Sequence, residues 1–164
     1  MHPDALISPA DKTALRRALG QFATGVTIVT ARTFDGQPVG FTANSFTSVS
    51  LEPPLLLVCL AHGAASYGAF RAADSFAVNV LAAGQEDTAK RFAQRGADKF
   101  GPTPWQEGAR GAPLIDGSLA RFDCAMHQRF AAGDHDILMG RVIGFSVDDG
   151  AALLYHRGAF HALG

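Results

Sequence analysis

The chain has 164 residues, of which 18% are charged, and a formal net charge of -1 at pH 7. A chain of this length can build one hydrophobic core but not two ordinary domains, so we expect a single domain over residues 1–164. Lys and Arg are scattered along it, which argues against nucleic acid or a membrane surface as a partner. The sequence has neither a bilayer-length apolar stretch nor the basic start of a signal peptide, and the cytoplasm is the expected compartment.

The first third of the chain predicts a helix and a β-hairpin. Residues 8–11 have the pattern of an N-cap and a first helical turn, and the helix is expected to end near residues 24–25. Alternating side chains over 26–31 predict a strand, and a turn at 35–36 leads to a second strand over 39–41.

Hydroxyl and amide side chains gather between this hairpin and a continuous apolar run over 55–60. Ser and Thr at this density also suit an ordinary turn-rich loop, in which hydroxyls bond to their own backbone. The flanking strands favour a binding loop instead, because buried polar groups need partners. Such side chains suit the pyrimidine edge, the polyol chain or the phosphate of a nucleotide. The candidate ligands are Thr42, Asn44, Ser45, Thr47 and Ser48.

Helices and strands alternate through the middle of the chain. We expect a short helix over 64–73, a strand over 76–81 and a second helix over 85–94. Ser66 starts the first helix and Arg91 lies on the second. Both are candidates for a phosphate, because a helix N-terminus and a guanidinium attract anions. Taken alone, each is also an ordinary surface residue.

The last third predicts a long antiparallel hairpin, preceded by a Gly- and Pro-rich lid or connector over 96–117. Over 122–130, mostly apolar side chains alternate with mostly polar ones, and a turn follows at 133–134. An apolar strand is then expected over 137–145, and a last strand at 153–156. Hairpins with few helices favour an antiparallel barrel with helices over its ends. No Gly-x-Gly-x-x-Gly or Gly-Lys-Ser/Thr motif occurs, so neither a Rossmann loop nor an NTPase phosphate loop is expected.

Histidines and cysteines give weaker signals. A metal site is not supported, because His156 and His161 are five residues apart and no paired Cys-x-x-Cys occurs. His135 stands between two acidic residues and is either a solvated turn residue or a substrate contact. Cys59 and Cys124 lie in predicted strands, where a thiol usually packs as a small hydrophobe.

Several segments, in one order, resemble the flavin reductase domain proteins, the short-chain NAD(P)H:flavin oxidoreductases that serve two-component monooxygenases. The resemblance runs from about Ala14 to Phe160. The segments that carry it are 22–30 (FATGVTIVT), 42–51 (TANSFTSVSL), 76–81 (FAVNVL), 98–100 (DKF), 111–114 (GAPL), 133–135 (GDH) and 154–158 (LYHRG). At 64–66 the chain has Ala-Ala-Ser, where relatives often show more hydroxyls and a basic residue.

The resemblance implies a mainly β fold with short helices, specifically an FMN-binding split β-barrel of Greek-key antiparallel type. It implies a flavin lying along 42–49 at a homodimer interface, with the isoalloxazine near Thr24, Gly25 and residues 44–45. By the same similarity, the flavin phosphate lies near Ser48, Ser66 and Arg91, and His135 is associated with the nicotinamide nucleotide. The implied flavin-binding set is Thr24, Gly25, Thr42, Asn44, Ser45, Thr47, Ser48, Val49, Ser66 and Arg91, without a metal.

The activity that the resemblance implies is NAD(P)H-dependent reduction of free flavin, delivered to a separate flavin-dependent oxygenase. The implied cofactors are FMN or FAD, with riboflavin also possible, and NADH or NADPH. Such a protein needs few acids or bases, because the two cofactors carry the chemistry. Two alternatives stay open: a flavoprotein of the same fold with permanently bound FMN and another electron acceptor, and a module that binds flavin or haem without turnover.

Overall fold

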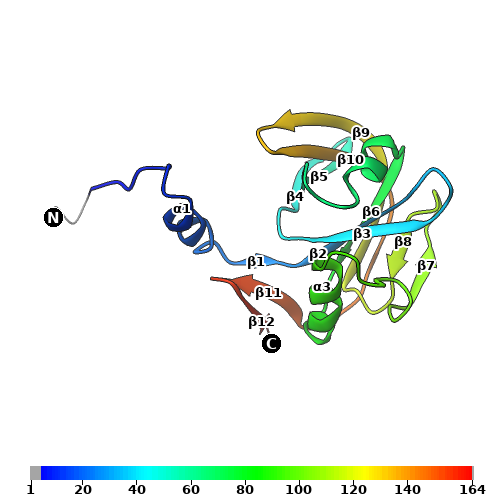
Figure 1. Cartoon of the computed structure of the whole chain (residues 1–164). Helices are drawn as coiled ribbons and strands as arrows, with labels where there is room; N and C mark the ends of the chain where they lie inside the picture. Colours follow the sequence, from blue (N-terminus) through cyan, green and yellow to red (C-terminus); the bar gives the residue numbers. More distant parts are fainter. Residues whose placement is uncertain (1–4, 164) are drawn as a thin grey trace.

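The computed structural model describes residues 5–163 and shows a mainly β chain with a few short helices (Figure 1). The helical segments are α1 (Lys12–Leu19), α2 (Tyr67–Ala72), the 3-10 turn η1 (Ala83–Gln85) and α3 (Glu86–Ala93). The strands are β1 (Thr24–Gly25), β2 (Thr27–Arg32), β3 (Pro38–Ala43), β4 (Thr47–Leu51), β5 (Pro54–Ala61), β6 (Ser75–Val80), β7 (Trp105–Glu107), β8 (Pro113–Ile115), β9 (Ala120–Ala132), β10 (His135–Val147), β11 (Ala152–His156) and β12 (Ala159–Leu163). Within these residues, every helix is too short or too polar to cross a membrane.

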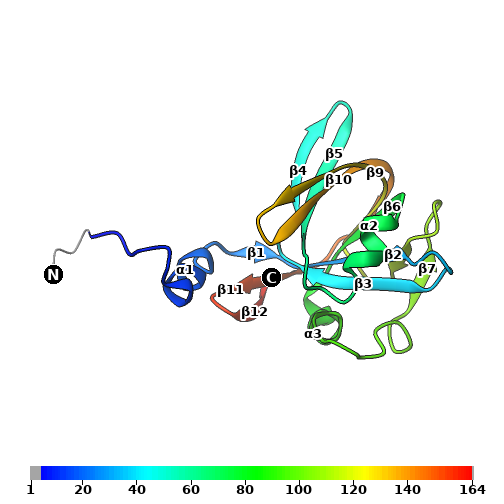
Figure 2. The ribbon, with the colours of Figure 1, turned by 45° about the horizontal axis from the view of Figure 1, so that its top comes forward.

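Seven strands form one antiparallel sheet, in the order β3-β2-β6-β9-β10-β5-β4. Its edge strands, β3 and β4, are consecutive in the chain but do not pair with each other within residues 5–163. The sheet curls, as the two views of Figures 1 and 2 show, and the end of β3 reaches β5. At this approach the Ser45 hydroxyl accepts a hydrogen bond from the Cys59 N–H at 2.9 Å. Residues far apart in sequence therefore meet beside the β3–β5 approach.

Both hairpins expected from the sequence are confirmed. β2 pairs with β3 around a turn with a positive φ at Gly36, and β9 pairs with β10 around a similar turn at Gly133. A positive φ is a conformation that glycine adopts without steric cost. A second sheet, β1-β11-β12, extends away from the main body and carries α1 at its outer end (Figure 1).

The buried side chains form two clusters, one on each side of the curled sheet's central strands. Phe70 and Phe76 belong to one cluster, and Phe92 belongs to the other. All three rings are at most 1% exposed. Burying such a ring contributes about 1.5–3 kcal/mol each relative to leaving it in water, so the clusters hold the helices on the sheet.

Helix α3 lies tightly on β3, and this contact positions the candidate site. A Cβ added to Gly40 would lie 3.0 Å from the Phe92 ring, so the strand leaves room for that ring only because this residue is glycine. The Thr42 hydroxyl donates to the Ala89 carbonyl at 2.6 Å. The C-terminal end of α3 is consequently held at the end of β3.

Several local expectations were wrong. Asp11, not Ser8, caps α1, because its carboxylate accepts the Ala14 N–H at 3.0 Å, and the helix ends at Leu19, well before residue 24. The polar segment 42–50 is not a loop throughout: β3 continues to residue 43, and β4 begins at residue 47. The segment 96–117, expected as a lid or a connector, also contains the short β7–β8 hairpin, which the sequence did not predict and which contradicts neither expectation.

Candidate functional site

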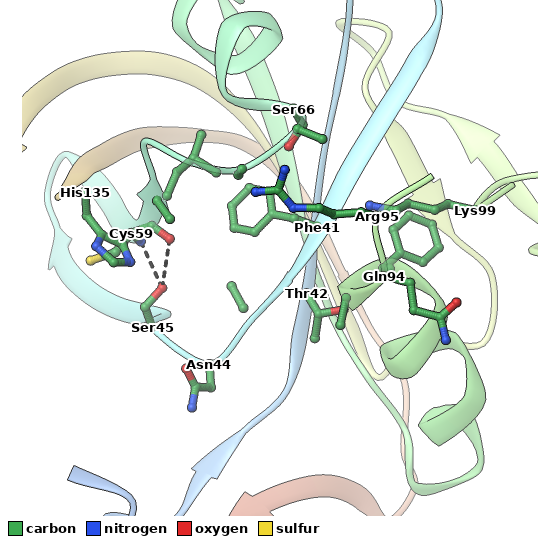
Figure 3. Close-up of a pocket in the computed structure, with 17 residues that line it drawn as sticks. Phe41, Thr42, Asn44, Ser45, Cys59, Ser66, Gln94, Arg95, Lys99 and His135 are labelled. Carbon is green, nitrogen blue, oxygen red and sulfur yellow. Dashed lines mark hydrogen bonds between the residues drawn. The ribbon is translucent and has the colours of Figure 1, made fainter. Parts of the chain in front are cut away.

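A cavity of about 340 Å³ lies where the end of β3, β5 and the C-terminal end of α3 meet (Figure 3). Small-molecule sites commonly have volumes of about 300–1,000 Å³. We call it the central cavity. It is lined by Phe41, Thr42, Ala43, Asn44, Ser45, Cys59, Leu60, Ala61, Ala64, Ala65, Ser66, Phe92, Ala93, Gln94, Arg95, Lys99 and His135.

Three predicted ligands from the polar segment line this cavity, but two of their side chains already bond to the backbone. The Thr42 hydroxyl donates to α3, and the Ser45 hydroxyl is shared with the N–H and the C=O of Cys59. These two hydroxyls fasten the cavity wall. Asn44 is exposed, and within the described chain its amide makes no hydrogen bond. It is therefore the member of the trio with free donors and acceptors.

The opposite side of the cavity carries positive charge. Figure 3 shows Ser66 and Arg95 across the cavity from Asn44, with Lys99 beside them. The Arg95 guanidinium donates to the Gly63 carbonyl, and the Lys99 ammonium donates to the Gly40 carbonyl at 3.3 Å.

We call the side of the central cavity that carries Ser66, Arg95 and Lys99 its cationic end. Neither Arg95 nor Lys99 has a carboxylate partner in the described chain. Burial lowers the pKa of Lys99, because an ammonium loses solvation there. The hydroxyl of Ser66 does not cap α2, although it stands at the N-cap position. Two cations and a free hydroxyl thus converge without an anion.

His135 begins β10 and borders the same cavity from the hairpin tip. Its Nδ1 lies 2.6 Å from a carboxylate oxygen of Asp134, and this contact lowers the pKa of Asp134. The His135 side chain is 45% exposed, so its other face is free to meet a ligand. The sequence expectation of a reachable turn histidine agrees with this position.

A half-buried network beside His135 joins the hairpin tip to the turn that carries Ser66. Asp136 is 8% exposed and binds His62 Nε2 at 2.8 Å and the Tyr67 hydroxyl at 2.9 Å. Hydrogen bonds from both partners lower the pKa of Asp136, and the one from His62 is the larger cause. Since His62 and Tyr67 flank the turn, Asp136 fixes the position of the turn relative to the hairpin tip.

A second cavity of about 500 Å³ continues from the first, and we call it the aromatic cavity. The rings of Tyr155 and Phe160 pack there edge to face, with 5.3 Å between their centroids. It is lined by Val26, Thr42, Asn44, Lys90, Ala93, Gln94, Tyr155, Gly158 and Phe160. Because it shares Thr42, Asn44, Ala93 and Gln94 with the central cavity, the two form one groove.

The predicted pair Thr24 and Gly25 forms β1 and pairs with Tyr155 and Leu154 of β11. These residues border the aromatic cavity through Tyr155 and the next residue in the chain, Val26. The Thr24 hydroxyl oxygen is buried and has no hydrogen-bond partner among the described residues. A buried hydroxyl without a partner is costly, so a bound group that satisfied it would gain affinity.

Besides Thr24 and Gly25, which only adjoin the groove, four predicted residues do not line it. Thr47, Ser48 and Val49 are exposed on β4, and Ser48 lines a separate apolar groove instead. The Arg91 guanidinium donates to the Thr103 hydroxyl at 2.9 Å, and that hydroxyl donates to the Lys99 carbonyl at 2.7 Å. Arg91 therefore braces the segment that presents Lys99 rather than reaching the cavity.

The residues that sequence reasoning missed are Arg95 and Lys99. Arg95 follows α3 by two residues, so a helical-face pattern does not include it. Lys99 lies within the 98–100 segment that carries the family resemblance, and this was the one available signal. Cys59 and Cys124 are both free thiols, and no group of three or more potential metal ligands occurs in residues 5–163.

A profile of the family described as "Flavin reductase like domain" matches residues 19–164. The chain belongs to this family. Its membership agrees with the resemblance carried by the sequence segments, and the flavin reductase family accounts for most of the chain's length.

Two curated relatives from the flavin reductase family illustrate the similarity. The chain is 48% identical, over 92% of its length, to a probable flavin reductase of Rhizobium meliloti, of which it covers 48%. It is 49% identical, over 89% of its length, to the reductase component of the flavin-dependent trigonelline monooxygenase of Acinetobacter baylyi, of which it covers 47%. The chain thus spans about half the length of these two curated relatives.

A solved structure extends the comparison. The NADH:FAD oxidoreductase of Streptomyces globisporus, in complex with NAD and FAD fragments, superposes with a TM-score of 0.90 at 43% identity. The superposition covers 96% of this chain and 95% of that one. The family fold is therefore shared over nearly the whole of both chains.

Proposed function

We propose that this protein is an NAD(P)H:flavin oxidoreductase that reduces diffusible flavin and supplies it to a separate flavin-dependent monooxygenase. The observation that carries the proposal is the anion-free cluster of Ser66, Arg95 and Lys99 at one end of a two-cavity groove. Membership of the flavin reductase family, and relatives named as NADH-dependent or as monooxygenase components, support the assignment.

The cationic end fits the phosphate of a flavin nucleotide. A phosphate would accept hydrogen bonds from the Arg95 guanidinium, the Lys99 ammonium and the Ser66 hydroxyl. A charge-assisted hydrogen bond contributes about 1.5–3 kcal/mol. Exposed ion pairs contribute less, about 0–1 kcal/mol, so exposed Arg95 counts for less than half-buried Lys99. Such a moderate affinity for the phosphate suits a flavin that must leave after reduction. FMN and FAD both carry a phosphate next to the ribityl chain, so both fit this end of the cavity.

The isoalloxazine is assigned to the junction of the central and aromatic cavities. Asn44 and Gln94 line both cavities, and the Asn44 amide offers a donor and an acceptor to a pyrimidine edge. Thr42 and Ser45 keep the wall in place through their backbone hydrogen bonds. Thr24 and Gly25 are proposed to contact the isoalloxazine from the side of the aromatic cavity, where Val26 and Tyr155 lie.

When bound, flavin supplies the hydride-accepting chemistry and reduced nicotinamide supplies the hydride. The protein supplies binding and orientation. His135 is the proposed contact to the nicotinamide nucleotide, with Asp134 orienting its ring. The hydrogen bonds of Asp136 to His62 and Tyr67 hold that contact at a constant position relative to Ser66. No acid or base on the protein is required for hydride transfer.

The finer architecture is also part of this proposal: one domain over residues 1–164, folded as a split β-barrel that opens between β3 and β4, and paired as a homodimer. An apolar groove supports the pairing, since Phe145 and Leu51 beside it are 72% and 94% exposed. Contiguous apolar surface of this kind marks interfaces. In such a dimer Thr47, Ser48 and Val49 remain proposed flavin contacts. Light scattering that gave an active monomer at micromolar concentration would contradict the pairing.

The test of the function is an assay matrix of NADH and NADPH against FMN, FAD and riboflavin. We expect the purified, flavin-free protein to consume NADH or NADPH only when a flavin is added. Flavin that elutes from gel filtration separately from the protein would identify it as an exchangeable substrate. No consumption under any pairing would refute the proposal. Cell fractionation tests the cytoplasm as the proposed compartment.

A further inference from the structure

A third cavity, of about 420 Å³, lies where α1 meets the β11–β12 turn. Figure 1 shows α1 at the outer end of β1, away from the main sheet. The Arg157 N–H donates to the Gly20 carbonyl at 3.0 Å and thereby fixes the turn against the end of the helix. We call this the arginine cavity, and it is lined by Arg16, Arg17, Gly20, Gln21, Tyr155, Arg157 and Gly158.

The charge in this cavity is of one sign. Three guanidinium-bearing residues, Arg16, Arg17 and Arg157, line it, and no acidic residue among those that the structure describes does so. Within residues 5–163 none of the three forms a salt bridge. Like charges that converge without counter-ions repel one another and attract an anion. Guanidinium groups bind phosphate oxygens in a bidentate manner.

Arg157 is held in an unusual backbone conformation. Its φ is 53°, and the following Gly158 has φ of 80°. A left-handed conformation is uncommon for a residue other than glycine, asparagine or aspartate. The chain nevertheless has arginine here, at the turn that faces the other two arginines.

The arginine cavity is continuous with the proposed flavin groove. It shares Tyr155 and Gly158 with the aromatic cavity, which in turn shares four residues with the central cavity. The continuous groove therefore has cations at both ends. The phosphate next to the ribityl chain of a flavin accounts for Ser66, Arg95 and Lys99, and leaves the arginine end without an anion.

We infer that the arginine cavity binds the phosphate groups of the nicotinamide nucleotide, an inference that rests on the proposed reductase function. NADH and NADPH carry a pyrophosphate, and NADPH a further 2′-phosphate, so either presents the multiply charged anion that three arginines suit. The nicotinamide end would lie at the junction of the aromatic and central cavities, and His135 borders the central cavity. Arg16, Arg17 and Arg157 are thus phosphate-binding residues for the reductant, and not for FMN.

The test compares Arg16→Gln/Arg17→Gln and Arg157→Asn with the wild type. Glutamine keeps helix propensity, and asparagine tolerates the positive φ. Lys12→Gln/Arg110→Gln is the matched control, because it removes two exposed charges, one from α1, outside the cavity. We expect the double arginine variant to raise the KM for NADH at least tenfold with little change in kcat. The Kd of FMN should stay within twofold, and the control should match the wild type.

Reduced nicotinamide riboside, a donor without phosphate, separates charge recognition from a change in shape. The variants should use this donor as well as the wild type does. An unchanged KM for NADH in the variants of an active enzyme would overturn the inference. An equal rise in the KM for the riboside would also overturn the inference. A loss of FAD affinity with an unchanged KM for NADH would overturn it as well, and would assign the arginines to the FAD pyrophosphate.

Binding without turnover keeps this result distinct from failure of the proposed function. ADP-ribose contains the pyrophosphate without nicotinamide, and adenosine lacks both. Calorimetry should show that the wild type binds ADP-ribose more tightly than adenosine, and that the double arginine variant loses this preference. If the wild type oxidised no NADH but showed this preference, only the reductase function would be refuted. Equal binding of ADP-ribose by wild type and variant would overturn the inference.

Discussion

Lys99 should recognise the flavin phosphate and not the flavin ring. In Lys99→Met the Nζ that donates to the Gly40 carbonyl is removed, while the length of the half-buried side chain is retained. Loss of one charge-assisted hydrogen bond costs about 1.5–3 kcal/mol, and about 1.4 kcal/mol is a factor of ten. The Kd of FMN should therefore rise about 10- to 150-fold. Arg95→Gln should have a smaller effect, because Arg95 is exposed and solvent screens its charge.

The assay is a fluorescence titration with FMN and, in parallel, with riboflavin, which has no phosphate. Riboflavin affinity should not change in either variant, and Lys12→Met serves as the control for loss of a distant lysine charge. An equal loss of FMN and riboflavin affinity would refute the assignment, because it would show a change in the ring site. Loss of FMN affinity in Lys12→Met would likewise show a long-range charge effect.

The pH dependence follows from the same residue. Burial lowers the pKa of Lys99 below the usual lysine value of about 10.4. A phosphate favours the ammonium form, so FMN affinity should be full below the Lys99 pKa and should fall as the pH rises through it. Riboflavin corrects for ionisation of the flavin ring, and Lys99→Arg, whose guanidinium stays charged, should remove the alkaline loss. An identical alkaline loss for Lys99→Arg would contradict the argument.

Three further predictions concern other parts of the groove. His135→Ala should raise the KM for NADH about tenfold, or about 1.4 kcal/mol, with the Kd of FMN unchanged; an equal loss of FMN affinity would make His135 a flavin contact. N-ethylmaleimide should modify Cys59 more slowly when FMN is present, because Cys59 lines the central cavity. It should not modify Cys124 in the folded protein, because burial raises the pKa of Cys124 to about 12. Mass spectrometry measures both, and rapid Cys124 labelling would contradict its burial. Asp136→Asn should lower the melting temperature near neutral pH, because hydrogen bonds depress the Asp136 pKa in the folded state. The difference in melting temperature between wild type and variant should disappear as the pH falls through that pKa. A difference that persists in strong acid would contradict the role given to the ionised Asp136.

The hairpins and most secondary structure were predictable because their signals are local. Alternation with a period of two residues, bounded by Gly36 and Gly133, places β2, β3, β9 and β10 without knowledge of the rest of the chain. Family membership was predictable for a related reason, since the segments that carry it are continuous in sequence. The exceptions were capping choices such as Asp11 over Ser8, where two suitable residues lie three apart.

The roles of individual polar residues were not predictable from the sequence, because they depend on contacts across the fold. Sequence alone determined that hydroxyls, amides and cations are available near a nucleotide-sized site. Only the docking of α3 on β3 decided that Arg91 braces Thr103 while Arg95 and Lys99 reach the cavity. Likewise, only the curl of the sheet brought Ser45 to the backbone of β5. A hydrogen bond has a reach of about 3 Å, so a side chain's partner is set by where distant segments pack, and local sequence does not encode that position.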